Sequence, residues 1–451
     1  MSLHRRLRAR AAAAAPIRVG VIGCGKFATM FLAQVPTTPG LEVVAVVDRE
    51  PDRARANLAR AGWPPEAAAG ADLDAAIARG GVHVGEDVTA MLADGRVDVV
   101  VEATGDACAG VDHAAAAIDA GKHVVMVNVE ADVLAGPALA ERAAAAGVVY
   151  GFAYGDQPAL ICELVDWAAT CGFTVVAAGK GTRYLPHFHR STPATVWDHM
   201  GFDPAEAEAA GMNPKMFNSF VDGTKSAIEM AAVANATGLA PQRRGLGFPP
   251  CGAGDLARRL RDPAGGGVLE HEGTVEVVAD LERDGRVIDD HLRWGVYVVV
   301  RAPNAYAARC LKEYGVVADD DGYAALWRPF HLIGLELARS IAAAVEYGEA
   351  IGATAGFVGD VAAVAKRPLA AGETLDGEGG TTVYGHLLPA ADAVAKRAVP
   401  IGLAHGVHLT RPLPAGAVVC RDAVSAPLHA AAAKIRAKIE ENFIESTRPK
   451  D

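Results

Sequence analysis

The sequence predicts an α/β protein that opens with a doubly wound parallel sheet of the Rossmann type. An α+β catalytic and oligomerisation domain and a small β-rich module are expected to follow. A glycine-rich turn joins an apolar strand to a helix near residue 25, and short apolar strands alternate with helices over the first 155 residues. Beyond that point the alternation stops, and longer helices and paired strands take its place.

Composition limits the classes of protein that the chain can belong to. With 51% hydrophobic and 22% charged residues, the 451-residue chain has the balance of a globular protein of two or three domains. A net charge of −11 without a basic stripe argues against nucleic acid as a partner. No apolar run reaches the roughly 18 residues that a transmembrane helix needs, so we expect no membrane partner.

The cysteines and the first residues carry expectations about location. The seven cysteines form no C-x-x-C pair, which is typical of reduced thiols in a cytoplasmic protein. Residues 1–20 are basic and lack acids, a composition shared with transit peptides. We expect an exposed leading helix there.

The first strand, turn and helix span residues 17–35. The turn reads Gly23-Cys24-Gly25-Lys26-Phe27-Ala28, the G-x-G-x-x-A form of the dinucleotide-binding fingerprint. The first glycine permits the tight turn, the second lets the backbone approach a pyrophosphate, and the helix N-terminus faces the phosphates. We expect Gly23, Gly25, Lys26 and Phe27 to bind a nicotinamide cofactor.

The second strand decides between the two nicotinamide cofactors. It ends in Asp48, where an acid binds the ribose hydroxyls of NAD. Arg49 follows at once, and Arg53 and Arg55 are close behind, in positions where an arginine accepts the 2′-phosphate of NADP. The sequence therefore favours NADP(H) and leaves NAD(H) possible.

Polar residues follow two further strands of the sheet, near residues 97–105 and 122–128. Because ligands of open α/β sheets bind at the carboxyl ends of the strands, we expect Thr104, Gly105 and Asn128 beside the cofactor. Helix capping is the alternative role for Thr104.

The middle of the chain, residues 156–350, has an α+β pattern. A helix at 157–172 precedes a strand at 173–181, and two strands flank an Arg-Asp-Gly turn within 274–303. A long apolar helix is expected at 330–350. The strand at 173–181 ends near Lys180 and Arg183, at the start of a loop rich in cations.

A stripe of charged and polar residues runs through the otherwise apolar segment Asn213–Gly238. Its members are spaced 3, 4, 3 and 4 residues apart, which places them on one face of a helix: Lys215, Asn218, Asp222, Lys225 and Glu229. Charged groups are costly to bury unless they are paired or face a cavity. The stripe is therefore either a thin exposed strip of ion pairs or the wall of an active site. A break at Gly223 would divide it into two shorter stripes.

The last hundred residues contain a repeated motif. The pattern R-P-L-x-A-G occurs within 366–375 and again within 410–419, 44 residues later, and each copy predicts a short strand, a turn and a strand. A terminal helix follows. The expected domains are a Rossmann domain at 1–155, a catalytic domain at 156–350, a β module at 351–428 and a helix at 429–451.

Several of these segments together resemble one family. "GVIGCGKFATMFLAQV", "EATG", "GKHVVMVNVEAD", "LPHF", "NPKMFNSFVDGTKSAIE" and "LDGEGGTTVYGHLLPA" are similar to the DXR-like (DRL) proteins, relatives of homoserine dehydrogenase. Some members of that family are 1-deoxy-D-xylulose 5-phosphate reductoisomerases. The C-terminal "GETLDGEGG" and "IGLAHGVHLTRPLPAGAVV" resemble the SAF (β-clip) domain that ends such proteins.

The resemblance implies an NADPH-dependent enzyme acting on a phosphorylated ketose or a similar anionic small molecule. Lys225 would transfer the proton at the substrate oxygen, and Asp222 and Glu229 would orient it. The candidates for binding the anionic group are Lys180, Arg183, Asn213, Lys215 and Asn218. Homoserine itself is disfavoured, because Asn128 is followed by Val129 where homoserine dehydrogenases have a lysine.

Two other functions stay open at this point. One is a plain NAD(P)-dependent dehydrogenase of the homoserine dehydrogenase type, acting on a small hydroxy acid, polyol or sugar phosphate. The other is a nucleotide-binding protein without catalysis. A divalent metal also stays open, since only Asp222 and Glu229 suggest ligands, and a homo-oligomer is expected.

Overall fold

A computed structural model describes residues 2–70, 72–209, 212–426 and 429–448. The chain forms two compact units, one of residues 1–160 and 331–354 and the other of residues 161–330 and 355–451. The expected domain boundary at residue 428 lies outside the described residues, as do the chain ends.

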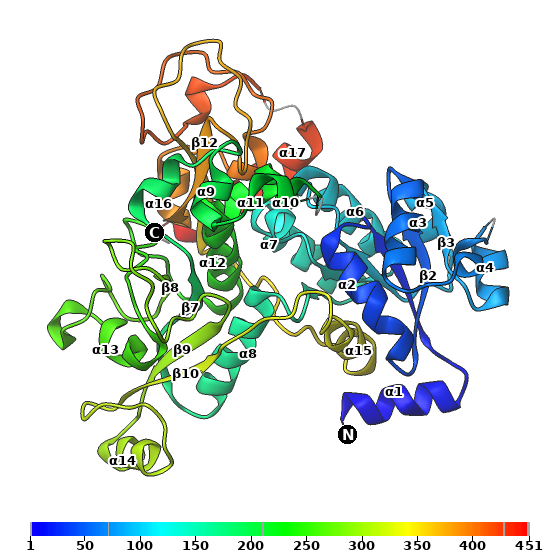
Figure 1. The fold of residues 1–451 in the computed structure, drawn as a ribbon, viewed down its shortest axis with the longest axis horizontal. Helices are drawn as coiled ribbons and strands as arrows, with labels where there is room; N and C mark the ends of the chain where they lie inside the picture. Colours follow the sequence, from blue (N-terminus) through cyan, green and yellow to red (C-terminus); the bar gives the residue numbers. More distant parts are fainter. Residues whose placement is uncertain (1, 71, 210–211, 427–428, 449–451) are drawn as a thin grey trace. The chain divides into compact units, whose positions relative to one another are not determined.

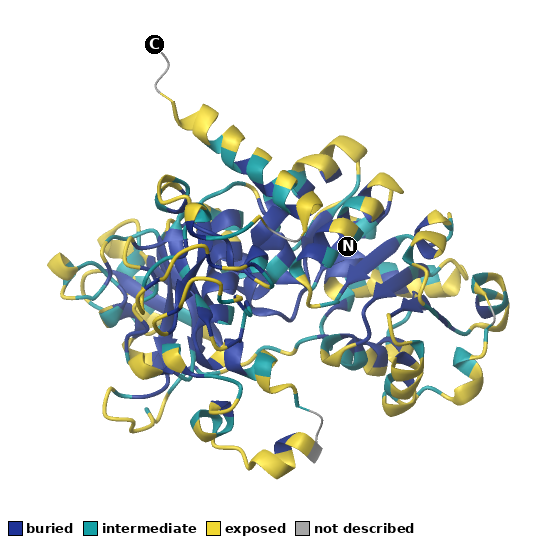
Figure 2. Ribbon diagram, turned by 90° about the horizontal axis from the view of Figure 1, so that it is seen from above, coloured by how far each residue is buried: buried dark blue, intermediate teal, exposed yellow. Residues whose placement is uncertain are grey.

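The first unit contains a six-stranded parallel sheet in the order β3-β2-β1-β4-β5-β6, which confirms the predicted doubly wound fold. The strands are β1 (Ile17–Ile22), β2 (Leu41–Val47), β3 (His83–Gly85), β4 (Val99–Glu102), β5 (His123–Met126) and β6 (Tyr150–Phe152). Their side chains are mostly valine and isoleucine, which suit strands buried on both faces. The strands are accordingly dark blue in Figure 2. The order reverses between β1 and β4, where sheets of this type bind their ligands.

Helices flank this sheet (Figure 1). They are α2 (Lys26–Gln34), α3 (Pro51–Arg60), α4 (Leu73–Arg79), α5 (Val88–Ala93), α6 (Ala107–Asp119), α7 (Val129–Ala146) and α15 (Ala338–Glu346). The helix expected at 330–350 is thus shorter. Gly334, at a φ of +70°, interrupts it, and a side chain there would meet the backbone of Phe27 on α2. Ile341 and Ala342 pack into the core of the parallel sheet, so α15 belongs to the Rossmann unit rather than to the domain in which we expected it.

The leading helix α1 (Leu3–Ala12) is more firmly attached than expected. Leu7 is buried in the core of the first unit. On the same helix, Arg6 and Arg10 both pair with Glu346 at the end of α15. In the part of the chain that the structure describes, no helix is long and apolar enough to cross a membrane.

The second unit is built on a mixed four-stranded sheet in the order β10-β9-β7-β8. Its strands are β7 (Thr174–Thr182), β8 (Thr274–Ala279), β9 (Val296–Arg301) and β10 (Tyr323–Arg328). The expected turn is present, closed by backbone hydrogen bonds between Glu282 and both Arg286 and Gly285. However, β8 and β9 do not pair with each other. Strand β7 lies between them, parallel to β8 and antiparallel to β9.

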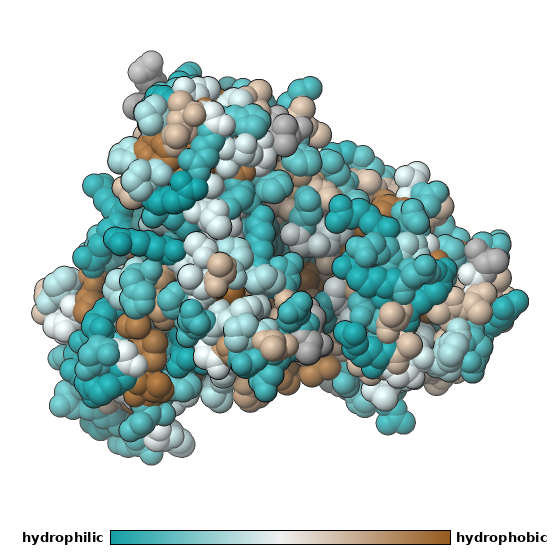
Figure 3. Space-filling view, turned by 45° about the horizontal axis from the view of Figure 1, so that its top comes forward, coloured by the Kyte–Doolittle hydropathy of each residue, from teal (hydrophilic) through white to brown (hydrophobic). Residues whose placement is uncertain are grey.

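Helices and a small antiparallel sheet complete the second unit. The helices are α8 (Gln157–Thr170, which begins in the first unit), α9 (Val196–Met200), α10 (Pro204–Ala209), α11 (Pro214–Val221), α12 (Thr224–Thr237), α13 (Leu256–Arg259), α14 (Ala305–Glu313), α16 (Ala390–Ala395) and α17 (Ala430–Thr447). The small sheet pairs β11 (Gly359–Ala365) with β12 (Val383–Pro389). Figure 3 shows a largely hydrophilic surface with apolar side chains in small areas, as the composition predicts for a globular protein.

The two copies of the repeated motif lie against each other. Leu369 of the first copy and Leu413 of the second exchange two backbone hydrogen bonds of 2.9 and 3.0 Å. The pairing is antiparallel and continues as isolated bridges, so the module is β-rich with few regular strands.

One buried carboxylate ties the returning segment to the first unit. Asp132 on α7 is fully buried and accepts hydrogen bonds from the hydroxyls of Tyr150 (2.8 Å) and Thr354 (2.8 Å). Burial raises its pKa to about 6, and the two hydroxyls only partly oppose that shift. Between the unfolded and folded pKa values the native state binds the extra proton, so folding stability decreases as pH rises through this interval.

We predict that Asp132→Asn gains stability relative to the parent as pH rises. Asparagine keeps an acceptor for both hydroxyls and carries no charge. The unfolding free energy of the variant minus that of the parent should increase by about 3 kcal/mol between about pH 4 and about pH 8. Thermal melting at several pH values measures this. Asp112→Asn, an exposed change on α6, is the control, and a difference independent of pH would contradict the prediction.

Candidate functional site

The glycine-rich turn has the shape that a dinucleotide requires. Gly23 adopts a φ of +87°, and a Cβ there would lie 2.8 Å from the backbone of Ala103 and Thr104. Gly25 precedes α2, and a Cβ at that position would meet no atom within 4 Å. The space in front of the turn is therefore open to a ligand that approaches the backbone. Lys26, which is exposed, and Phe27, which is half-buried, form the first turn of α2.

Asp48 holds this turn from the end of β2. Its carboxylate is buried and accepts the backbone N–H groups of Cys24 (2.7 Å) and Glu50 (2.9 Å), while Arg53 lies 3.1 Å away. Burial opposes ionisation, but these hydrogen bonds and Arg53 together lower the pKa of Asp48. Arg49 is exposed beside it. The carboxylate thus stabilises the glycine-rich turn, and the exposed Arg49 and Arg53 lie beside it.

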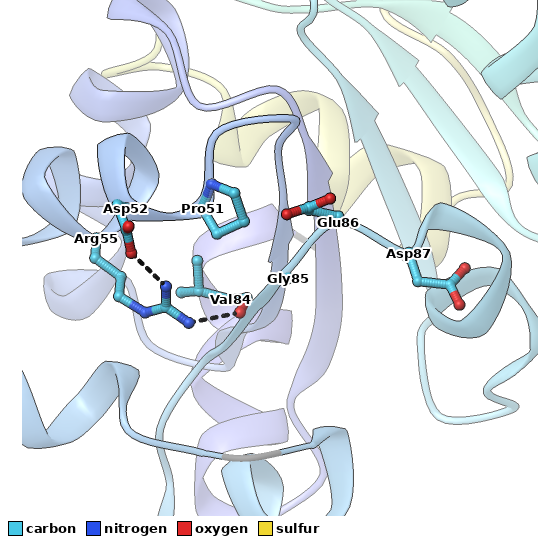
Figure 4. A pocket seen from close by; sticks show the side chains of 7 residues that line it. All are labelled: Pro51, Asp52, Arg55, Val84, Gly85, Glu86 and Asp87. Carbon is cyan, nitrogen blue, oxygen red and sulfur yellow. Dashed lines mark hydrogen bonds and ion pairs between the residues drawn. The ribbon is translucent and has the colours of Figure 1, made fainter.

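An open hollow adjoins these residues at the carboxyl end of β3 (Figure 4). Pro51, Asp52 and Arg55 from α3 line one side of it, and residues 84–87 line the other. Arg55 pairs with Asp52 (3.0 Å) and donates to the carbonyl of Val84 (3.1 Å). This arginine therefore braces the wall of the hollow, unlike Arg49.

The polar residues after β4 and β5 form a connected group. Thr104 donates to the buried carboxylate of Glu102 (2.6 Å). Asn128 caps α7 by accepting the N–H of Ala131 (3.1 Å), and its amide donates to Thr104 (3.3 Å). The structure therefore gives Asn128 the capping role and brings it together with Thr104. Gly105, at a φ of +73°, is exposed beside them.

In the second unit, the charged stripe is divided. The segment expected as one helix forms α11 and α12, separated at Gly223, which has a φ of +86°. A left-handed residue cannot continue a right-handed helix, so the chain restarts at Thr224. Asp222 lies in this turn, whereas Lys225 and Glu229 lie on α12.

Two carboxylates of the stripe form buried ion pairs with lysines from elsewhere. Glu229 pairs with Lys180 of β7, and both side chains are buried. Asp222 pairs with Lys366, which follows β11, at 2.7 Å, and both are buried as well. Lys225 is half-buried. The tertiary structure thus pairs these two carboxylates with lysines from distant segments.

Aromatic and histidine side chains surround Asp222. His189 bonds through Nδ1 to the carbonyl of Asp222 (2.8 Å), and the hydroxyl of Tyr184 lies 2.8 Å from its Nε2. The imidazole stacks on Tyr384 with ring centres 4.5 Å apart. Burial lowers the pKa of His189. The neutral ring therefore donates from Nδ1 and accepts the tyrosine proton at Nε2.

The other candidates for anion binding have internal partners. Asn213 caps α11, Lys215 donates to the carbonyl of Asp376 (2.7 Å), and Asn218 donates to that of Gly379 (2.9 Å). The latter two contacts hold the loop 376–380 against α11.

Arg183 is in a different setting. It pairs with Asp280 (3.3 Å) at the end of β8, and the same carboxylate lies 3.9 Å from Arg293. Two guanidinium groups therefore share one carboxylate.

Lys366 and Tyr384 were missed by the sequence interpretation. The two motif copies do carry a signal for the lysine, because they differ at this position. The first copy begins Lys366-Arg367-Pro368 and the second Thr410-Arg411-Pro412. Within the described ranges, no three histidine, cysteine, aspartate or glutamate side chains group as metal ligands. Asp222 and Glu229, the pair considered for a metal, each face a lysine instead.

Two family models match segments of the chain. Residues 17–127 match the family model of the oxidoreductase family with the NAD-binding Rossmann fold. Residues 155–337 match that of the oxidoreductase DRL catalytic domain. The chain therefore combines an NAD(P)-binding Rossmann domain with the catalytic domain of an oxidoreductase. No curated protein sequence matches the chain.

Among solved structures, similar ones include KijD10, a 3-ketoreductase from Actinomadura kijaniata, at 24% identity over 37% of this chain and 49% of that one, with a TM-score of 0.25. A homoserine dehydrogenase from Thiobacillus denitrificans matches at 21% identity over 48% of this chain and 49% of that one, with a TM-score of 0.34. A probable dehydrogenase from Thermotoga maritima matches at 15% identity over 74% and 90%, with a TM-score of 0.37. The chain spans about half the length of the first two structures.

We predict that Gly25→Val weakens cofactor binding. The new side chain would occupy the open space before α2 and keep a pyrophosphate from the backbone, raising the cofactor Kd by on the order of 100-fold. Titration of the nicotinamide fluorescence measures the Kd. The exposed change Ala59→Val on α3 is the control. An unchanged affinity in Gly25→Val would exclude this turn as the pyrophosphate site.

Proposed function

We propose that the protein is an NADPH-dependent oxidoreductase that acts on a small phosphorylated ketose, as a DRL-type reductoisomerase does, with hydride transfer to a carbonyl group either directly or after a skeletal rearrangement. One observation carries the proposal. The segment that matches the DRL catalytic domain includes the charged residues Asp222, Lys225 and Glu229, and it places them on and beside a helix that is otherwise almost entirely buried. A buried helix with ordered charges is typical of an active-site wall.

The preference for NADPH rests on the residues around Asp48. Its two oxygens already accept backbone and arginine hydrogen bonds, so they are poorly placed to accept the ribose hydroxyls of NAD. Arg49 and Arg53 are exposed at the same rim and supply the positive charge that suits a 2′-phosphate.

We predict that Arg49→Ala changes the choice of cofactor. Loss of this cation should raise the Kd for NADPH by about tenfold and leave the Kd for NADH nearly unchanged, because only NADPH carries the 2′-phosphate. Fluorescence titration with both cofactors measures the ratio. Arg60→Ala, at the far end of α3, is the control. Equal weakening of both cofactors would remove Arg49 from phosphate recognition.

The proposed chemistry assigns one role to each charged residue. When bound, NADPH would supply the hydride that the carbonyl carbon accepts. Lys225 donates a proton to the carbonyl oxygen, which yields the alcohol. Of the lysines in this region, Lys180 and Lys366 are buried, whereas Lys225 is half-exposed and therefore able to exchange protons with solvent. Asp222 and Glu229 orient the helix face from which Lys225 acts.

An anionic substrate is supported by the arginines near Asp280. Arg183 and Arg293 contribute two positive charges against one buried carboxylate, and the pKa of Arg293 is lowered by burial and by Arg183. A bound phosphate would relieve this repulsion.

The direct experiment supplies purified protein with 1-deoxy-D-xylulose 5-phosphate, NADPH and either Mg²⁺ or Mn²⁺. Oxidation of NADPH, followed by its absorbance, is the expected result, and no turnover with either metal would overturn this substrate. A panel of small hydroxy acids, polyols and sugar phosphates with NADP⁺ and NAD⁺ tests the alternative of a plain dehydrogenase.

We predict that Lys225→Met abolishes turnover while cofactor binding persists. Methionine keeps most of the side-chain volume and removes the proton donor, so kcat should fall by about 10³-fold or more. Steady-state kinetics and the NADPH Kd provide the two measurements. Lys434→Met, an exposed change on α17, is the control. If Lys225→Met turned over as fast as the parent, another group would have to supply the proton.

Other features of the proposal stay predictions. They are the SAF character of the C-terminal module, the relation to homoserine dehydrogenase, the homo-oligomer and the cytoplasmic location. None of the seven cysteines, all of which lie in the described residues, forms a disulfide, which suits a reducing compartment.

A further inference from the structure

Lys366 is a buried lysine of the C-terminal module, and it contacts the charged stripe at Asp222. Its ammonium group lies 2.7 Å from Asp222 and donates to the carbonyls of Ser191 (2.7 Å) and Gly380 (2.6 Å). The two carbonyls accept hydrogen bonds from the ammonium group, and the carboxylate faces it as the opposite charge. The side chain is therefore held in one position at the start of α12.

The charge of Lys366 acts directly on Asp222. Burial raises the pKa of Asp222, and Lys366 is the main influence in the opposite direction, followed by Thr224, whose N–H lies 2.9 Å away. The other groups that face it are His189 and Tyr384. Burial lowers the pKa of the imidazole and raises that of the phenol, so both rings are neutral near pH 7. Lys366 is thus the cation that most strongly opposes the effect of burial on this carboxylate.

The repeated motif separates this role from folding of the module. The two copies pair through Leu369 and Leu413 and differ in the residue before the shared R-P-L. The second copy has Thr410 there, which is exposed, so the module forms its turn without a lysine. A lysine buried in the first copy destabilises the fold unless its charge is paired, and the partner here is Asp222.

We infer that Lys366 is a positioning residue for the reaction, and that the C-terminal module completes the catalytic site by supplying the cation that pairs with Asp222, three residues before Lys225. The inference rests on the proposed function of Asp222 and Lys225. It assigns to the module a part in catalysis in addition to any part in assembly.

The test compares Lys366→Met with Lys366→Arg, which restores the charge. In the methionine variant, kcat should fall by on the order of 100-fold while the Kd for NADPH is unchanged. Removal of the cation raises the pKa of Asp222, so the acidic limb of the pH profile of kcat should move upward by about one unit or more. The arginine variant should recover part of kcat and return the limb toward the parent. An unmoved limb, or no recovery with arginine, would overturn the positioning role.

A second measurement requires no substrate. Lys366→Met leaves an unpaired buried carboxylate, so the melting temperature should fall, and adding Asp222→Asn should restore most of the loss. The double variant should remain inactive. Thr410→Met, the matching change in the second motif copy, should alter neither kcat nor melting. Failure of Asp222→Asn to restore stability would overturn the electrostatic link.

These outcomes separate the inference from the proposed function. If the parent turns over none of the substrates but the double variant regains stability, the proposed function fails and the link between Lys366 and Asp222 stands. If the parent is active and the pH profile of Lys366→Met equals that of the parent, the proposed function stands and the inference fails.

Discussion

The ion pair between Asp222 and Lys366 is the constraint on which the second unit depends. A fully buried carboxylate is destabilising without a partner, so the turn at Gly223 and the end of β11 must meet. Once they meet, Lys366 also donates hydrogen bonds to the carbonyls of Ser191 and Gly380. These contacts bring the loop that contains His187 and His189 close to the loop 376–380. The ammonium group of Lys366 thus contacts the turn before α12 and two loops.

A similar requirement shapes the cofactor end of the first unit. Asp48 is buried and therefore needs hydrogen-bond donors, and it finds them in Cys24 and Glu50. The acid that a sequence motif associates with ribose binding becomes a support for the glycine-rich turn. The exposed Arg49 beside it is then the better candidate for contact with the cofactor.

Most strands of the Rossmann sheet could be predicted, because their signals are local, but the short strand β3 was not. The strands are short valine-rich runs, Gly23 has a conformational and steric reason to be glycine, and Gly25 leaves the space in front of the turn open. The helix at 330–350 could not be bounded in the same way. Its apolar run continues through Gly334, and only contact with α2 requires the left-handed conformation there. Likewise, the Arg-Asp-Gly turn was predicted, but its flanking strands pair through β7, a long-range choice that local pattern does not contain.

The sequence by itself determined the doubly wound fold, the glycine-rich turn and the position of the charged stripe, since each follows from residue type and spacing along a short segment. Tertiary structure decided the partners of the charges. Spacing along one helix suggested that Asp222 and Lys225 act as neighbours, yet a left-handed glycine divides the helix, and Asp222 is balanced by Lys366 from the C-terminal module. The energy of a buried charge depends on which opposite charge the folded chain brings within a few ångströms, and residues far apart in the sequence meet only in the folded chain.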